Sequence, residues 1–182
     1  FIAGLNDSKQ LSAAKREQLY DEIIAKAVAI EVNIVSVSNI DKLNIYTATQ
    51  RGMAEVLEHL PVQPQVALID AMPVEAKGIN TVSIVHGDAL SASIAAASII
   101  AKVTRDRIME RMDVLYPAYG FANNKGYGSS AHMQAIAEYG ATKWHRRSYE
   151  PVKSMQPEPV VAAVNELYSP QLEPDYVFSI NP

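Results

Sequence analysis

Apolar residues repeat every three to four positions over long parts of the chain, which predicts amphipathic helices. The expected helices are residues 12–28, 39–60, 91–116 and 131–139. Ser12 is a good N-cap for the first helix, and Asn39 or Asp41 would cap the second. The third should end near Tyr116, because the following proline disfavours helical geometry in the residue before it.

Shorter apolar or β-branched runs between these helices predict strands. The expected strands are residues 32–37, 66–70 and 81–86. The run VALID at 66–70 is apolar up to its last residue, which is typical of a strand buried on both faces. The alternation of helices and strands predicts an α/β fold.

The third predicted helix passes from an alanine-rich apolar part into a cluster of charges. Its sequence from Ser91 to Asp106 is SASIAAASIIAKVTRD. On a 3.6-residue repeat, Ile99, Val103 and Asp106 lie in one line, with Lys102 one turn before the aspartate. Asp106 is therefore expected at the border of the buried face, where a carboxylate needs a cation or a metal ion nearby.

Asp70 is a second carboxylate that closes an apolar element. It stands at the carboxyl end of the strand 66–70, and ligands of open α/β sheets bind outside such ends. Asp70 and Asp106 are thus candidate ligands of one divalent cation. The simpler alternative is a capping aspartate and a salt-bridged helix aspartate. His86, His132 and His145 show no paired metal spacing, and we predict structural or surface positions for them.

Length and composition restrict the class of protein. The 182 residues are 48% hydrophobic, enough for one domain with its own core. The absence of cysteine excludes disulfides and thiolate metal sites and agrees with a cytoplasmic location. No apolar run is long enough to span a membrane. The chain opens on Phe1 without a signal pattern, so we expect it to begin inside a longer protein.

Charge is distributed unevenly. Residues 1–101 carry 7 Lys and Arg against 11 Asp and Glu, residues 102–153 carry 9 against 5, and residues 154–182 carry none against 4. The net charge of −4 argues against a wholly basic nucleic-acid binder. The positive block after the central helix is nevertheless typical of a surface that contacts phosphates, with an ordinary mixed surface as the alternative.

The last third of the sequence predicts two exposed segments and an extension. Residues 119–130 are rich in Gly, Ser and Asn and predict a loop of a length that is often functional. Residues 143–147 predict an exposed basic segment. Residues 154–182 are acidic and Pro-rich, and we expect an extension that is partly helical at 160–167 or disordered.

Six motifs resemble those of bacterial ribonuclease HII, in the family's order and spacing: LNDSKQLS, NIYTATQRGM, VALIDA, GDALSASIAAASIIAKVTRDRIM, YPAYGFANNKGYGSSAH and YGATKWHRRSYEPVK. The resemblance covers about residues 3–153. It implies a ribonuclease-H-like mixed sheet flanked by helices, in a catalytic domain of residues 1–153. It also implies an endonuclease that hydrolyses the RNA strand of RNA–DNA hybrids and cuts at ribonucleotides embedded in duplex DNA, by a two-metal-ion mechanism.

The resemblance also implies site residues. Asp70 and Asp106 match the family's third and fourth acids, which bind Mg²⁺ or Mn²⁺, hard ions that prefer oxygen ligands. Tyr127 matches the tyrosine that packs against the sugar at the RNA–DNA junction, and its alternative role is to pack the loop onto the core. The candidate phosphate contacts are Lys102, Lys125, Arg146 and Arg147.

One departure from the family pattern concerns activity. The family's first two acids form an Asp-Glu pair followed by Gly-Arg-Gly, and this motif is not in the 182 residues. We therefore expect an N-terminally incomplete copy that lacks the first strands, binds metal poorly and does not cleave. The alternative is a non-catalytic nucleic-acid-binding remnant. An α/β small-molecule enzyme is disfavoured because the sequence has no glycine-rich phosphate loop. The expected partners are RNA–DNA hybrids or ribonucleotide-containing duplexes, bound by a monomer.

Overall fold

The computed structural model describes residues 2–155 and 176–180. The chain divides into two compact units, which are described separately below. The first unit comprises residues 1–35, 46–104 and 175–182, and the second comprises residues 36–45 and 105–174. Helices and strands alternate along the chain, and the strands form one antiparallel and one parallel pair. The predicted mixed α/β class is therefore confirmed.

Helix α1 (Ala13–Lys26) follows Ser12, whose side chain accepts the backbone N–H of Lys15 at 3.2 Å. The predicted N-cap is thus confirmed. The other longer helices are α3 (Ile45–His59), α5 (Ala92–Leu115) and α7 (Ser130–Tyr139). Helix α5 ends at the predicted place, before Tyr116 and Pro117. Within the part that the structure describes, no helix is both long and apolar enough to cross a membrane.

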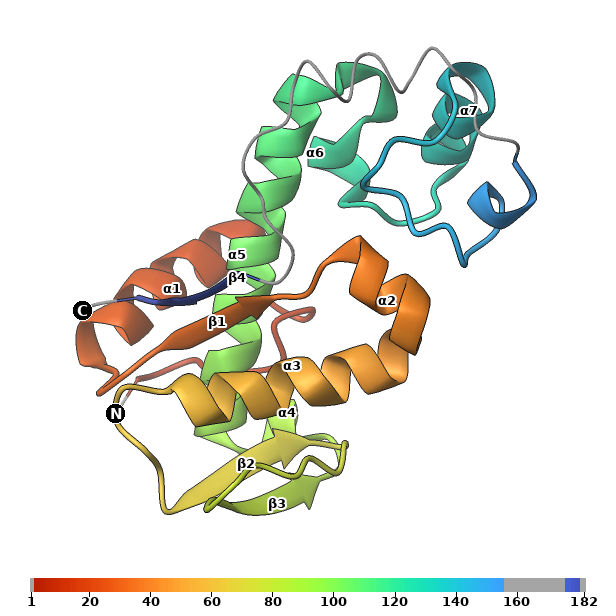
Figure 1. Cartoon of the computed structure of the whole chain (residues 1–182). Helices are drawn as coiled ribbons and strands as arrows, with labels where there is room; N and C mark the ends of the chain where they lie inside the picture. The colour runs from red at the N-terminus through yellow and green to blue at the C-terminus, as the bar shows by residue number, and fades with distance from the viewer. Residues whose placement is uncertain (1, 156–175, 181–182) are drawn as a thin grey trace. The chain divides into compact units, whose positions relative to one another are not determined.

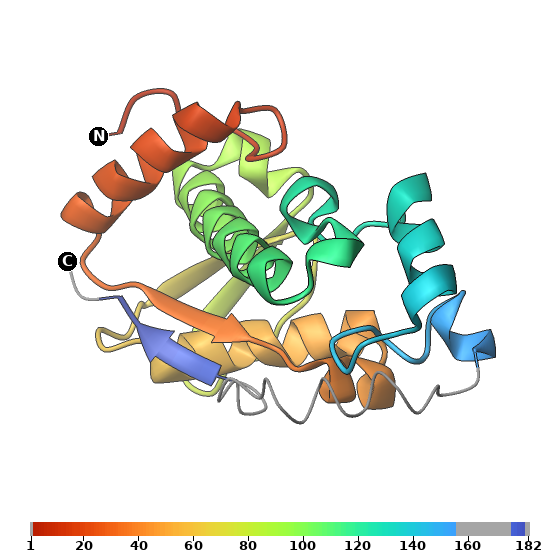
Figure 2. The same cartoon turned by 90° about the horizontal axis from the view of Figure 1, so that it is seen from above.

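The first unit contains two pairs of strands. Strand β1 (Glu31–Ile34) runs antiparallel to β4 (Tyr176–Ser179), side by side in both views (Figures 1 and 2). Strand β2 (Val66–Asp70) runs parallel to β3 (Asn80–Ile84), with Asp70 opposite Ile84. Three of these strands lie where the sequence predicts them, whereas β4 lies in the extension and was not predicted.

Strand β2 differs from its prediction in burial. Ala67 and Ile69 are buried against Leu57 of α3 and Val74. Val66 and Leu68 on the other face are 48% and 39% exposed. The prediction of a strand buried on both faces is therefore wrong for the described residues. A five-residue apolar run has the same sequence signature whether one face or both faces are covered.

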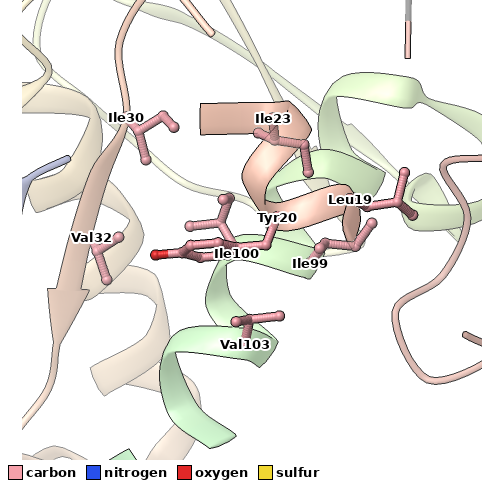
Figure 3. Close-up of a cluster of buried hydrophobic side chains, with 8 residues drawn as sticks. All are labelled: Leu19, Tyr20, Ile23, Ile30, Val32, Ile99, Ile100 and Val103. Atoms are coloured by element: carbon pink, nitrogen blue, oxygen red, sulfur yellow. The ribbon is translucent and has the colours of Figure 1, made fainter. Parts of the chain in front are cut away.

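The main core of the first unit joins α1, β1 and the first half of α5. Figure 3 shows the side chains of α1 and α5 facing one another, with Ile30 and Val32 beside them. Leu19 and Ile99 are completely buried in this cluster. Phe178 and Ile180, on and just after β4, pack against its edge. The alanines of α5 leave room for this close packing, as their small size predicts.

The predicted helix 39–60 is two helices in the structure. Ser36, rather than Asn39 or Asp41, caps the short helix α2 (Val37–Leu43) through a 3.2 Å bond from the Asn39 backbone N–H. The chain then turns at Asn44, which has a φ of 65°. Asparagine tolerates this left-handed backbone better than most residues, so it is a suitable break between two helices.

The second unit has its own core of aromatic and aliphatic side chains. Its buried members are Met112, Tyr116, Tyr119, Phe121, Ala135, Ile136 and Val152. The predicted loop 119–130 is partly helical, because it contains the end of a 3₁₀ turn (Pro117–Tyr119) and the short helix α6 (Phe121–Asn124). Helix α7 confirms the predicted helix and ends at Gly140, which has a φ of 80°. The predicted helix 160–167 lies outside the described residues.

Candidate functional site

Asp70 is the last residue of β2, at the end of its parallel pairing with β3. Its Oδ1 atom accepts the backbone N–H of Gly87 at 2.8 Å, and the side chain is half-buried. Gly87 is the first residue of the short helix α4 (Gly87–Leu90), which follows β3. One carboxylate oxygen is therefore held by the backbone, which fixes the orientation of the other.

The backbone on both sides of this contact is strained. Ala71 has a φ of 52° and His86 a φ of 56°, values that residues with a Cβ atom rarely adopt. The Ala71 N–H donates to the Ile84 carbonyl at 2.9 Å, so the left-handed turn still belongs to the ladder between β2 and β3. Strained residues of this kind cluster at functional sites, because the surrounding fold must hold them in place.

A side chain at Gly87 would require the buried Ile94 to move. A Cβ atom built there would lie 2.5 Å from Cδ1 of the buried Ile94 and 3.4 Å from Asp70 Oδ1. This role of Gly87 is not apparent from the residue pattern. The one hint in the sequence is that a glycine directly follows the predicted strand 81–86, where no helix ends, and such a glycine often marks a close approach of the backbone to another group.

Asp106 lies on α5, in line with Ile99 and Val103, which are 0% and 2% exposed. Both Asp106 and Lys102 are half-buried, so the predicted position at the border of the buried face is confirmed. Asp70 belongs to the first unit and Asp106 to the second. The convergence of the two acids stays a prediction.

Tyr127 lies in the second unit on a turn that hydrogen bonds hold in shape. Asn124 accepts the Gly126 N–H through Oδ1 at 2.8 Å and donates from Nδ2 to the Tyr119 carbonyl at 2.7 Å. Gly126 adopts a φ of 79°, and the Tyr127 side chain is 64% exposed. This exposure argues against the alternative that Tyr127 packs the loop onto the core.

Lys125, two residues before Tyr127, forms an ion pair and a backbone hydrogen bond within the second unit. Its Nζ atom lies 2.8 Å from Glu110 Oε1, and its carbonyl accepts a bond from Arg105 at 3.1 Å. The lysine side chain is only 18% exposed. A phosphate contact from Lys125 would therefore require the ion pair with Glu110 to open.

The basic segment, residues 143–147, is only partly exposed. Arg147 is exposed and Arg146 is half-buried, with its guanidinium 3.9 Å from the centre of the Tyr149 ring. His145 is buried, which corrects the prediction of a wholly exposed segment. A bond between Thr142 and His145 turns this side chain inward, which sequence periodicity could not indicate.

His145 and His132 form a buried pair with Nε2 atoms 3.3 Å apart. The Thr142 N–H donates to His145 Nδ1 at 3.0 Å, so the His145 hydrogen is on Nε2 and faces an accepting His132 Nε2. Burial and the nearby His132 lower the pKa of His145 to about 4. Burial also lowers the pKa of His132, and the Tyr119 carbonyl opposes this only in part. Their burial is compatible with the predicted structural positions.

Residues 2–155 and 176–180 contain no group of three or more His, Cys, Asp or Glu side chains that could hold a metal ion. Carboxylates such as those of Asp70 and Asp106 suit a hard divalent ion, and their role as metal ligands stays a prediction. The predicted roles of these residues are metal coordination by the carboxylates, packing of Tyr127 against a sugar and phosphate binding by the basic side chains, and all three stay predictions.

Comparison with solved structures supports the fold. The crystal structure of the ribonuclease H2 from Pyrococcus horikoshii OT3 matches with a TM-score of 0.68 and 24% identity, over 90% of this chain and 82% of that one. A structure of the PCNA:RNase HII complex from Archaeoglobus fulgidus matches with a TM-score of 0.62 and 25% identity, over 86% and 82%. The first similarity, below 25% identity, concerns the fold alone.

Sequence comparison identifies the family. The chain is 53% identical to ribonucleases HII of Bacillus cereus (strain Q1) and Bacillus anthracis (strain CDC 684 / NRRL 3495), over 155 residues that make up 85% of this chain. These residues cover 60% of each relative, so the chain spans less than two thirds of their length. The sequence model of the family described as Ribonuclease HII matches residues 2–152. This match covers most of the chain, which therefore belongs to the ribonuclease HII family.

Proposed function

We propose that this chain forms part of a divalent-metal-dependent endoribonuclease, to which it contributes Asp70 and Asp106. The proposed reaction is hydrolysis of the RNA strand of RNA–DNA hybrids and of the backbone at single ribonucleotides in duplex DNA. Family membership supports the class of reaction. The observation that carries the proposal is the held carboxylate of Asp70, bound to the Gly87 N–H between two strained residues.

Asp70 and Asp106 would hold Mg²⁺ or Mn²⁺ through oxygen atoms. When bound, such ions activate a water molecule and stabilise the leaving oxygen of an in-line displacement. Gly87 would keep Asp70 oriented through its N–H, so that the carboxylate does not have to be reorganised when an ion binds. The further acids implied by the resemblance, an Asp-Glu pair before Gly-Arg-Gly, are not among the 182 residues.

The second unit would supply substrate contacts. Tyr127 exposes its ring on a rigid turn, which suits stacking against a sugar or a base without a hydrogen-bond code. Arg146 and Arg147 would contact backbone phosphates, with Lys102 as a further candidate. Lys125 would join them only after leaving Glu110. Binding should therefore weaken steeply as the salt concentration rises.

A non-catalytic nucleic-acid-binding protein is the second candidate. The lack of a three-ligand group within the described ranges favours it, because binding needs only Tyr127 and the basic side chains. The two candidates share their substrate and differ in cleavage.

A nicking assay separates the two candidates. A labelled DNA duplex with one ribonucleotide is incubated with Mg²⁺ or Mn²⁺ and one of two proteins. These are the 182-residue chain and a fusion that adds before Phe1 the Asp-Glu and Gly-Arg-Gly segment that the family resemblance implies. We expect both proteins to bind and only the fusion to nick, with Asp70→Asn or Asp106→Asn abolishing the cut. A fusion that binds without nicking would leave the binding protein as the function. Nicking by the 182-residue chain would show that the first two acids are dispensable.

A further inference from the structure

Asp41 makes a set of hydrogen bonds that the helix-cap prediction did not anticipate. Its Oδ2 atom accepts the backbone N–H of Arg147 at 2.8 Å, and its Oδ1 atom accepts the backbone N–H of Ser148 at 3.0 Å. The Ser148 hydroxyl also donates to Oδ1. All three residues belong to the second unit, and more than a hundred positions of sequence separate Asp41 from its partners.

These bonds hold a stretch of chain that has no regular structure of its own. Residues 140–150 contain neither helix nor strand, so no backbone ladder fixes the basic segment. Thr142 and His145 hold its inner side, and Asp41 holds the turn on which Arg147 and Ser148 lie. A long side chain in an irregular segment loses much conformational entropy on binding unless its backbone is already fixed.

The Asp41 carboxylate accepts a hydrogen bond from the backbone of Arg147, not from its side chain. Arg147 is exposed, and the Arg146 guanidinium stacks on the ring of Tyr149. Partial burial alone would raise the pKa of Asp41, but hydrogen bonds from Ser148 and Arg147 and the charge of Arg146 hold it below its usual value. Asp41 is therefore ionised at neutral pH and accepts all three bonds.

We propose that Asp41 is a positioning residue for nucleic-acid binding, which fixes the 147–148 turn so that Arg146 and Arg147 face the phosphates of a duplex. The inference rests on the proposed function, because it assumes that these arginines contact phosphate. Asp41 itself need not touch the duplex. Its negative charge near the basic segment opposes binding electrostatically, whereas its hydrogen bonds favour binding by fixing the backbone.

These two effects predict opposite results for Asp41→Asn. The substitution removes one negative charge, which by electrostatics alone would strengthen binding to DNA. In an asparagine a donating NH₂ group replaces one of the two accepting oxygens, so with the same geometry the side chain accepts only one of the two backbone N–H groups. We expect the loss of positioning to dominate. Asp21→Asn is the matched control, because Asp21 is exposed on α1 and its loss changes the net charge equally.

The test is fluorescence anisotropy of a labelled duplex with one ribonucleotide, titrated with each variant at several salt concentrations. For Asp41→Asn we expect weaker binding and a log–log salt slope that is smaller by about one for each lost arginine contact. For Asp21→Asn we expect binding equal to or slightly stronger than that of the wild-type chain. Ser148→Ala removes one bond without a change of charge, and its binding should be intermediate.

Amide hydrogen exchange supplies a second readout that does not involve the duplex. In Asp41→Asn the Arg147 and Ser148 amides should exchange faster, while Trp144 fluorescence shows that the unit is still folded. Binding by Asp41→Asn that equals that of Asp21→Asn would overturn the inference and leave the proposed function intact. Weaker binding with unchanged amide exchange would also overturn it. A wild-type chain that binds no duplex would overturn the proposed function and this inference with it.

Discussion

A fall in pH from 7 to 5 should destabilise the second unit through its buried histidine pair. The pKa of His145 is lowered from an ordinary 6.5 to about 4, by burial first and by His132 second. Between these two values the unfolded chain binds a proton on His145 that the folded chain does not. The free energy of unfolding therefore falls as the pH falls through this window. The stability due to the neutral ring is complete above pH 6.5 and lost by about pH 4.

The expected magnitude follows from the size of the shift. At about 1.4 kcal/mol for each pKa unit, the whole effect is about 3 kcal/mol. At pH 5 the unfolded-state histidine is mostly protonated and the folded-state one is mostly neutral, so about 2 kcal/mol is lost between pH 7 and pH 5. Burial lowers the pKa of His132 too, which adds to the loss in the same direction.

Trp144 makes the effect measurable. It is the single tryptophan, it packs against the core of the second unit, and urea unfolding followed by its fluorescence reports on that unit. His145→Asn keeps an acceptor for the Thr142 N–H and removes the titrating ring, so its unfolding free energy should depend less on pH between 7 and 5. If the unfolding free energies of the wild-type chain and of His145→Asn depend equally on pH, the attribution of this pH dependence to His145 is refuted.

Two further predictions concern stability, measured by urea unfolding followed by circular dichroism. Gly87→Ala should lower the free energy of unfolding by about 1–3 kcal/mol, because the new Cβ would lie 2.5 Å from the buried Ile94. In the control Gly128→Ala the new Cβ meets nothing closer than 3.7 Å, so the free energy of unfolding should change by less than about 0.5 kcal/mol. Ile99→Ala should cost about 2–5 kcal/mol because the side chain is 0% exposed. Val114→Ala removes a side chain that is 81% exposed and should have almost no effect. Similar costs in a variant and its control would contradict the packing described above.

Local signals in the sequence were sufficient for the elements that depend on neighbouring residues. Ser12 caps a helix, Pro117 stops another, and Gly140 ends a third, because each acts within one turn of its own position. The apolar run 66–69 likewise predicts the end of the strand at Asp70, because a run of apolar residues is a local signal. The position of Asp106 followed from the helical repeat, which fixes the face on which a residue lies.

Features that depend on distant residues could not be predicted in this way. Asp41 looked like a helix cap, and only the fold brings it to Arg147. His145 lies in a basic run, so its burial beside His132 was not apparent. One face of β2 is exposed because no segment covers it, and β4 pairs with β1 although the two strands are far apart in the sequence. The residue pattern of a strand does not show which other segment covers it or pairs with it.

The most direct test of the account is whether Asp70 and Asp106 serve one metal site. In a spectrum of the ¹⁵N-labelled chain, Mn²⁺ broadens the amide signals of residues near its binding site, and Mg²⁺ serves as the diamagnetic reference. The account predicts that signals next to Asp70 and next to Asp106 broaden together as Mn²⁺ is added, and that either Asp→Asn substitution removes the broadening at both places. Asp21→Asn should remove it at neither. Broadening that persists around one acid after the other has been replaced would contradict the shared site.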